Sequence, residues 1–141
     1  MRVYKKYPYL LIVLLIIVSS LIAFGRIASN DFINFDDQGY ITENHYIKSG
    51  VNRESIQWAF QNAVMDNWIP LSLISHMVDW SLFGKNAAGH HLVSLFLHMG
   101  AVIFLFLFLN KTTQNIWAST FAAVFFALHP LHVESVAWAS E

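Results

Sequence analysis

Three long apolar runs constrain what this chain can fold into. The first covers residues 9–28 and is unbroken from Leu10 to Val18, and the others cover residues 90–109 and 116–138. A transmembrane helix needs about 20 mostly apolar residues to cross the hydrocarbon core of a bilayer. The sequence therefore predicts an all-α membrane protein with three transmembrane helices. A cleaved signal peptide is the alternative for the first run, because it shares the opening positive charge.

The third run contains Pro130. Proline is tolerated in a membrane helix when a neighbour or water satisfies the freed carbonyl. At 1.5 Å per residue, a helix over residues 116–138 would cover about 33 Å, enough to cross. The pattern does not decide between a kink at Pro130 and the end of a span.

The composition agrees with a membrane protein. Only 12% of the 141 residues are charged and 56% are hydrophobic, whereas a soluble domain carries about 25% charged residues. The net charge of -1 and the lack of a basic stripe exclude a nucleic-acid partner. The absence of cysteine excludes disulfides, thiolate metal sites and a cysteine nucleophile.

A loop of residues 29–89 separates the first two runs. Apolar residues recur at helical spacing over residues 54–66 and again over residues 71–83, and Trp68 and Trp80 suit a membrane interface. We expect two amphipathic helices lying along the membrane surface. A small soluble subdomain between the spans is the alternative.

Basic residues set the expected orientation. Arg2, Lys5 and Lys6 precede the first run, whereas the long loop has only three basic residues. The positive-inside rule then places the N-terminus in the cytoplasm and the loop of residues 29–89 on the outer face, in the periplasm or an equivalent lumen. Membrane lipid is therefore an expected partner.

An acidic pair, Asp36 and Asp37, follows the first span closely. Neighbouring side chains of an extended segment point to opposite sides, so we expect one carboxylate to face a cavity as base or ligand and the other to brace the loop. An Asx turn or a helix cap is the structural alternative.

Histidines are expected at the same level of the membrane as the acidic pair. His90 and His91 open the second span, and His129 lies beyond the middle of the third. Ionisable groups at such depth are costly and indicate function. His129 and His132 are three apart and would share a helical face, suited to a phosphate, a metal or a proton, or else to hydrogen bonding between helices. Glu134 joins them only if Pro130 distorts the backbone.

Three further polar residues are expected to have structural roles. His76 and Asp79, three apart, are predicted to form a simple surface pair, and His98 to bond between helices. No zincin-type spacing is present. No cofactor is predicted, and a divalent cation is left open.

Several segments carry a resemblance to a known family. They resemble the N-terminal part of bacterial multi-span proteins with C-terminal TPR repeats, and through them the animal transmembrane and TPR-repeat O-mannosyltransferases of the class C glycosyltransferase superfamily. The resemblance covers residues 30 to 141. The matching segments are residues 32–37, 58–60, 67–72, 75–77, 82–84, 89–92 and 126–138.

The resemblance implies an inverting glycosyltransferase at the outer face of a membrane, here a bacterial inner membrane. The donor would be a polyprenyl-phosphate-linked sugar, with mannose as the candidate, and the acceptor a hydroxyl of a protein or glycan. Asp36 or Asp37 would be the general base. His129 and His132 are candidates for the lipid phosphate, and His90, His91 and Glu134 for other substrate contacts.

One position departs from the family, which often has histidine where Ile69 stands. Because the family continues with further spans and repeats, we expect this chain to be an N-terminal fragment of a larger polytopic fold, inactive alone. A non-catalytic membrane assembly or docking subunit is the second reading.

Overall fold

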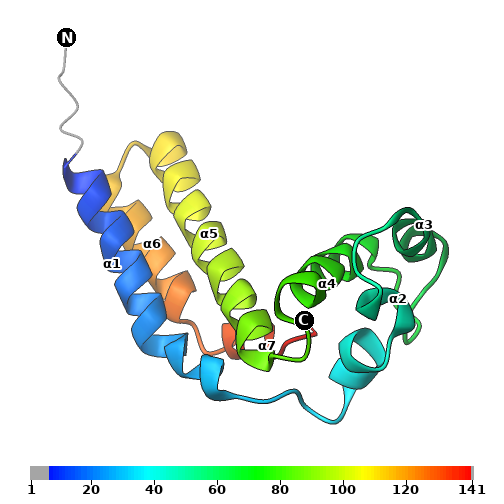
Figure 1. The fold of residues 1–141 in the computed structure, drawn as a ribbon. Coiled ribbons are helices and arrows are strands. Elements are labelled where there is room, and N and C mark those ends of the chain that lie inside the picture. Colours follow the sequence, from blue (N-terminus) through cyan, green and yellow to red (C-terminus); the bar gives the residue numbers. More distant parts are fainter. Residues whose placement is uncertain (1–6, 141) are drawn as a thin grey trace.

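The computed structural model describes residues 7–140, and this part of the chain is helical with no β-strand beyond one isolated bridge. Arg2, Lys5 and Lys6, on which the predicted orientation rests, lie outside the described residues. The elements in chain order (Figure 1) are α1 (Tyr7–Phe24), η1 (Gly25–Ser29), η2 (Gln38–Thr42), α2 (His45–Lys48), α3 (Arg53–Gln61), α4 (Pro70–Phe83), α5 (Ala87–Thr113), α6 (Ile116–Leu128) and α7 (His132–Ala137).

Helices α1, α5 and α6 lie side by side as a bundle (Figure 1). Their shared core contains Ile16, Val102 and Phe106, each with no exposed surface. The Asn110 side-chain amide donates a hydrogen bond of 3.0 Å to the Tyr9 hydroxyl, so the start of α1 meets the end of α5. The loop elements join the bundle at its opposite end (Figure 1).

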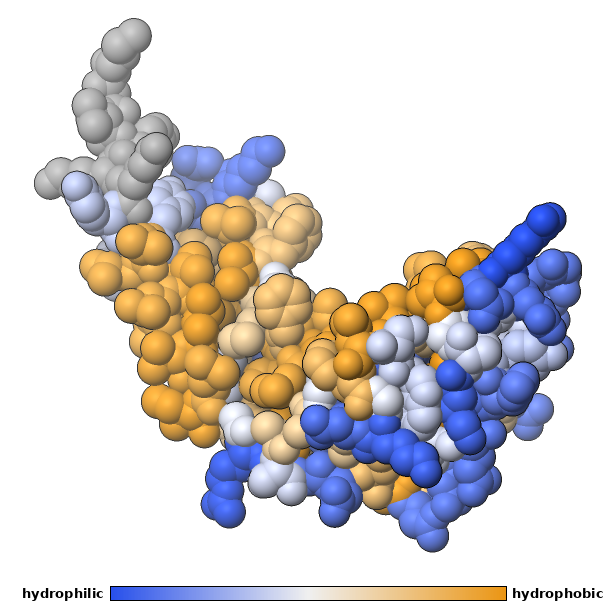
Figure 2. Space-filling view, viewed as in Figure 1, coloured by the Kyte–Doolittle hydropathy of each residue, from blue (hydrophilic) through white to orange (hydrophobic). Residues whose placement is uncertain are grey.

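The outer surface of the bundle is apolar (Figure 2). Large side chains such as Ile22, Phe104 and Phe121 are more than 70% exposed, and monomeric soluble proteins rarely expose such continuous apolar surface. The segment Tyr7–Ser29 and helix α5 are each long and apolar enough to cross a membrane. This finding supports a membrane protein and two of the three predicted spans.

The third run does not form one helix over residues 116–138. Helix α6 ends at Leu128 after 13 residues, about 20 Å, and α7 is a separate six-residue helix. His129 between them has an extended backbone, with φ of -67° and ψ of 131°. Proline disfavours the helical conformation in the residue before it, so Pro130 ends the helix rather than kinking it.

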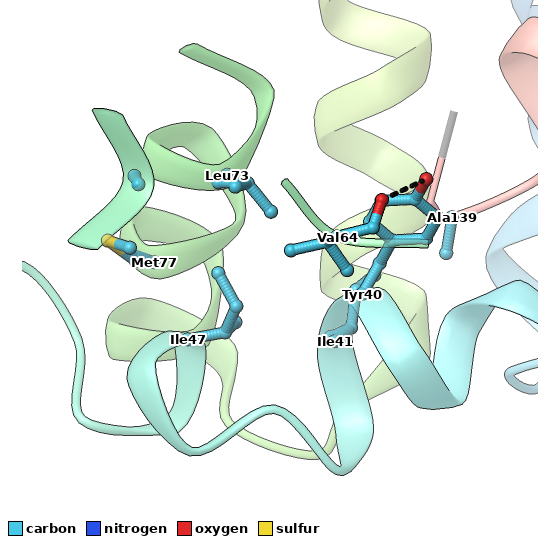
Figure 3. Packing of buried hydrophobic residues seen from close by; sticks show 8 residues of the cluster. Tyr40, Ile41, Ile47, Val64, Leu73, Met77 and Ala139 are labelled. Atoms are coloured by element: carbon cyan, nitrogen blue, oxygen red, sulfur yellow. Dashed lines mark hydrogen bonds between the residues drawn. The ribbon is translucent and has the colours of Figure 1, made fainter. Parts of the chain in front are cut away.

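Elements η2, α2, α3 and α4 form a loop subdomain with its own hydrophobic core. Ile41, Ile47, Leu73 and Met77 are fully buried in this core, and Ala139 reaches it from beyond α7 (Figure 3). The alternative expectation, a small subdomain between the spans, therefore describes how these residues pack. Hydrophobic side chains gather along the upper side of the loop subdomain in Figure 2, and hydrophilic ones cover most of its lower and right sides. That it rests on a membrane surface stays a prediction.

Local signals explain where the loop helices begin and end. The Asn52 side chain accepts from the Ser55 amide at 3.0 Å, and the Ser55 hydroxyl accepts from the Asn52 amide at 3.1 Å, which forms a capping box at the start of α3. Pro70 opens α4, where its missing amide donor costs nothing. Gly84 ends α4 with a φ of +56°, a conformation that glycine adopts readily.

Candidate functional site

The two carboxylates of the acidic pair lie in different surroundings. Asp36 is half-buried and lines an open polar cavity of about 340 Å³. Asp37 has no exposed surface, and its Oδ2 accepts a hydrogen bond of 2.8 Å from the Ile33 amide, while its Oδ1 has no partner. One carboxylate thus faces a cavity and the other fastens the loop, although the pair opens a helical turn rather than an extended segment.

We call this space the acidic cavity. Its other walls come from η2, from the turn before α4, from α4 and from the segment after α7. They are formed by Tyr40, Asn67, Ile69, Ser72 and Ser140. The Tyr40 hydroxyl accepts a hydrogen bond of 2.9 Å from the Asn67 amide and donates one of 3.3 Å to the Val64 carbonyl (Figure 3). Hydroxyl, amide and carboxylate groups together can bind a polar ligand such as a sugar hydroxyl.

The predicted surface pair of His76 and Asp79 is wrong, because both side chains are buried, with 7% and 6% of their surface exposed. Neither ring nitrogen of His76 has a hydrogen-bond partner. Burial, and to a smaller extent the nearby His90, lower the pKa of His76 to about 4, against smaller opposing effects of the Ser140 backbone and Asp37. Burial raises the pKa of Asp79, while His90 lowers it. Ionisable side chains therefore lie beneath the acidic loop as well as in it.

His90 and His91 are each only 1% exposed. The Nε2 of His90 lies 3.0 Å from the Gly84 carbonyl oxygen, and its ring packs edge-on against Phe32 with centroids 5.1 Å apart. Both ring nitrogens of His91 are buried without a partner. A substrate would reach either ring only if the covering side chains moved, so their proposed substrate contacts stay predictions.

A second group of histidines lies where α5, α6 and α7 meet. The ring centroid of His132 is 5.6 Å from that of His98 and 6.1 Å from that of His129. The Nε2 of His98 lies 3.1 Å from the Ala127 carbonyl oxygen of α6, which confirms the expected bond between helices. His129 and His132 do not share a helical face, since α6 ends between them, yet their rings still lie close together.

Two of these histidines, His98 and His132, border a cavity of about 340 Å³, which we call the histidine cavity. Its polar lining comes from Ser94, His98, His132 and Ser135. His129 lines a different, apolar cavity of about 290 Å³ beside Pro130. Glu134 is exposed and lines neither of these. The substrate contact predicted for Glu134 therefore stays a prediction.

One short segment of the chain runs from the histidine cavity to the acidic cavity. Val136 lines the histidine cavity and Ser140 lines the acidic cavity. Four residues span at most about 14 Å when fully extended. The last segment therefore connects a carboxylate-lined space and an imidazole-lined space that the sequence alone did not link.

Several residues of these cavities were not identified from the sequence. Asn67 lies in a segment of the family resemblance, but no role was assigned to it, and single serines such as Ser94 and Ser140 carry no pattern. Within residues 7–140, no group of three or more His, Cys, Asp or Glu side chains is arranged to hold a metal ion.

These features define an all-helical protein with two helices able to cross a membrane and a carboxylate-lined cavity in the loop between them. The chain is 25% identical over 131 residues to the human protein O-mannosyl-transferase TMTC1, and this match covers 84% of the chain. It is 32% identical over 71 residues to Tmtc1 and 33% identical over 72 residues to Tmtc2, both protein O-mannosyl-transferases of Drosophila melanogaster, each match covering 50% of this chain.

These matches span only 8% to 14% of the length of those relatives. No protein-family model and no solved structure matches the chain. The comparisons thus support a distant resemblance to transferases of this kind over the chain, with most of each relative unmatched.

Proposed function

We propose that this chain forms part of a membrane glycosyltransferase that moves a sugar from a polyprenyl-phosphate-linked donor to an acceptor hydroxyl at the outer membrane face. The observation that carries the proposal is the position of Asp36 on an open polar cavity beside the buried Asp37. The distant similarity to O-mannosyl-transferases supports the class of reaction. Mannose is the first sugar to test.

Asp36 acts as the general base in this proposal. Its carboxylate takes the proton from the acceptor hydroxyl as the hydroxyl oxygen attacks the anomeric carbon. A new glycosidic C–O bond forms, the bond between the anomeric carbon and the phosphate oxygen breaks, and the polyprenyl phosphate leaves with the electron pair. A single displacement inverts the configuration of the anomeric carbon. Asp37 holds the loop by accepting from the Ile33 amide, so Asp36 is the better placed of the two.

The histidine cavity is the proposed site of the donor phosphate. Imidazole nitrogens and serine hydroxyls can each donate a hydrogen bond to phosphate oxygens, and His132, Ser94 and Ser135 line this space. The short connection from Val136 to Ser140 keeps the two cavities within reach of one lipid-linked sugar. The apolar surface of the bundle suits the polyprenyl chain.

The experiment is a transfer assay with membranes that contain the complete product of the gene. A radiolabelled polyprenyl-phosphate sugar is the donor, and the labelled product is counted. We expect His132→Ala to raise the KM for the donor at least tenfold, while His45→Ala, an exposed histidine of α2, leaves it unchanged. No transfer by the unmodified protein from any such donor would refute the proposal.

The non-catalytic reading, a membrane assembly or docking subunit, makes the opposite prediction. A docking subunit would support the function of its partner whether or not Asp36 carries a charge. Complementation of a deletion strain by the Asp36→Asn variant at the wild-type level, together with no transfer in the assay above, would favour this reading.

A further inference from the structure

We propose that the loop subdomain carries a second binding site, for a pyranose ring of a neutral carbohydrate, on the surface shared by α2 and α3. An open polar cavity of about 380 Å³ lies there, which we call the aromatic cavity. It is lined by Tyr46, Glu54, Gln57, Trp58, Gln61 and Asn62. None of these residues lines the acidic or the histidine cavity.

Two stacked aromatic rings form one wall of the aromatic cavity. The ring centroids of Tyr46 and Trp58 are 4.5 Å apart, and the ring planes are 12° from parallel. Trp58 also packs against the core of the loop subdomain, so the stack is held in place. Each ring covers one face of the other, so a ligand would meet the outer face of the stack and the polar tips of the two rings. A pyranose ring has a matching apolar face of C–H groups and a rim of hydroxyls.

The polar side of the cavity comes from one face of α3. Glu54, Gln57 and Gln61 are three and four residues apart, and Trp58 follows Glu54 by four residues, which places them on the same side of the helix. Within residues 7–140, the side chains of Glu54, Gln57 and Gln61 make no hydrogen bond to the protein. A glutamine amide can donate and accept at once, as a sugar hydroxyl can, so these groups are suited to a polyhydroxylated ligand.

The charge of the cavity favours a neutral ligand. Glu54 is the only ionisable group among the lining residues apart from the Tyr46 phenol. A single exposed carboxylate repels anions such as nucleotides and binds a cation only weakly in water. An aromatic wall with a few placed polar groups is typical of small-molecule sites in general. A carbohydrate is the class that uses all three features, the flat wall, the amides and the single acceptor carboxylate.

This site is independent of catalysis and can be tested without turnover. The protein is placed in lipid nanodiscs, and saturation-transfer NMR measures binding of mannotriose, with maltotriose as a second neutral sugar and AMP as an aromatic, anionic comparison. We expect saturable binding of a trisaccharide in the millimolar range. The double variant Gln57→Ala, Gln61→Ala should weaken it at least fivefold, and Trp58→Ala should abolish it.

Controls separate this site from the proposed active site and from a folding defect. Trp117→Ala, at a 79% exposed position of α6, should leave binding unchanged. Binding that is lost in Asp36→Asn but kept in the glutamine double variant would place the sugar in the acidic cavity and overturn the proposal. Because Trp58 contacts the core, loss of binding in Trp58→Ala does not by itself separate a lost contact from a folding defect. The double variant of the exposed Gln57 and Gln61 therefore decides the test. The proposal is overturned if no trisaccharide binds saturably, if the double variant binds as the wild type does, or if AMP binds in preference to the sugars.

Discussion

The side-chain amide of Asn67 donates a hydrogen bond of 2.9 Å to the hydroxyl of Tyr40. This bond joins the helical turn that follows the acidic pair to the turn that precedes α4. The same hydroxyl donates to the Val64 carbonyl at 3.3 Å. One phenol therefore fixes a wall of the acidic cavity next to Asp36, and it does so with neutral hydrogen bonds.

Replacement of Tyr40 by phenylalanine tests this relationship. Tyr40 is only 6% exposed. Tyr40→Phe removes one hydrogen bond from the Asn67 side-chain amide and one from the Val64 carbonyl, which still accepts from the Asn67 backbone amide at 2.9 Å. We expect the free energy of unfolding to fall by about 1–3 kcal/mol, measured by denaturant titration in detergent. Tyr7→Phe, at a 77% exposed position, is the control and should change nothing. Equal stability of both variants would contradict the role assigned to the Tyr40 hydroxyl.

The contact between α4 and α5 depends on a glycine. A Cβ atom at Gly89 would lie 2.2 Å from Cγ of Phe83, whereas one at Gly100 would meet nothing within 4 Å. Gly89→Ala should therefore lower the thermal midpoint by several degrees. Gly100→Ala should leave it unchanged or raise it, because alanine favours a helix interior by about 1 kcal/mol. A Gly89→Ala protein as stable as the Gly100→Ala protein would show that the two helices are not packed this closely.

The buried His76 should make the loop subdomain sensitive to acid. Its pKa is lowered to about 4 in the folded protein, against about 6.5 when unfolded. Between these values the unfolded chain binds the extra proton, so the free energy of unfolding falls as the pH drops from about 6.5 to about 4, by roughly 3 kcal/mol in all. Asp37 and His90 are the ionisable neighbours of His76, and Asp79, whose pKa is raised, opposes the slope at acid pH.

Denaturant titrations at several pH values check this expectation. The His76→Gln variant should lose less stability between pH 6.5 and pH 4 than the wild type, to an extent set by the pKa of His76. His45→Gln, at an exposed position, should keep the wild-type slope. Parallel curves for the wild type and His76→Gln would show that His76 stays protonated or solvated in the folded protein.

The predicted orientation can be tested because the chain has no cysteine. Lys48 and Lys111 are both exposed lysines, the first in the loop subdomain and the second in the last turn of α5, at the opposite end of the bundle. Lys48→Cys should react with an impermeant maleimide on intact cells, and Lys111→Cys only after permeabilisation. The reverse pattern would place the acidic cavity in the cytoplasm.

Two of the three predicted spans could be recognised from the sequence because length and apolar content alone set the requirement for crossing a bilayer. The third could not, because the backbone around His129 and Pro130 determines whether α6 continues. The helices of the loop were predicted near their observed positions. Their tertiary contacts were not, since a run of apolar residues looks alike on a membrane surface and around a small core.

The sequence identified the acidic pair but not its surroundings. Spacing alone indicated that Asp36 and Asp37 would differ, and the structure gives them different environments. The burial of His76 and Asp79 could not be inferred from their spacing, because it depends on the acidic loop, α5 and Ser140 covering α4. Ser140 follows α7, and it lines the acidic cavity because the chain changes direction between α6 and α7.

The most direct test of the account compares Asp36→Asn with Asp37→Asn in the complete gene product, by the initial rate of sugar transfer per folded protein. A general base contributes about 10²–10⁴-fold to a rate, so Asp36→Asn should reduce transfer by that factor without lowering the thermal midpoint. Asp37→Asn should lower the thermal midpoint and keep most of the rate per folded protein. Full activity of Asp36→Asn, or a greater loss of rate in Asp37→Asn than in Asp36→Asn, would contradict the assignment of Asp36 as the base.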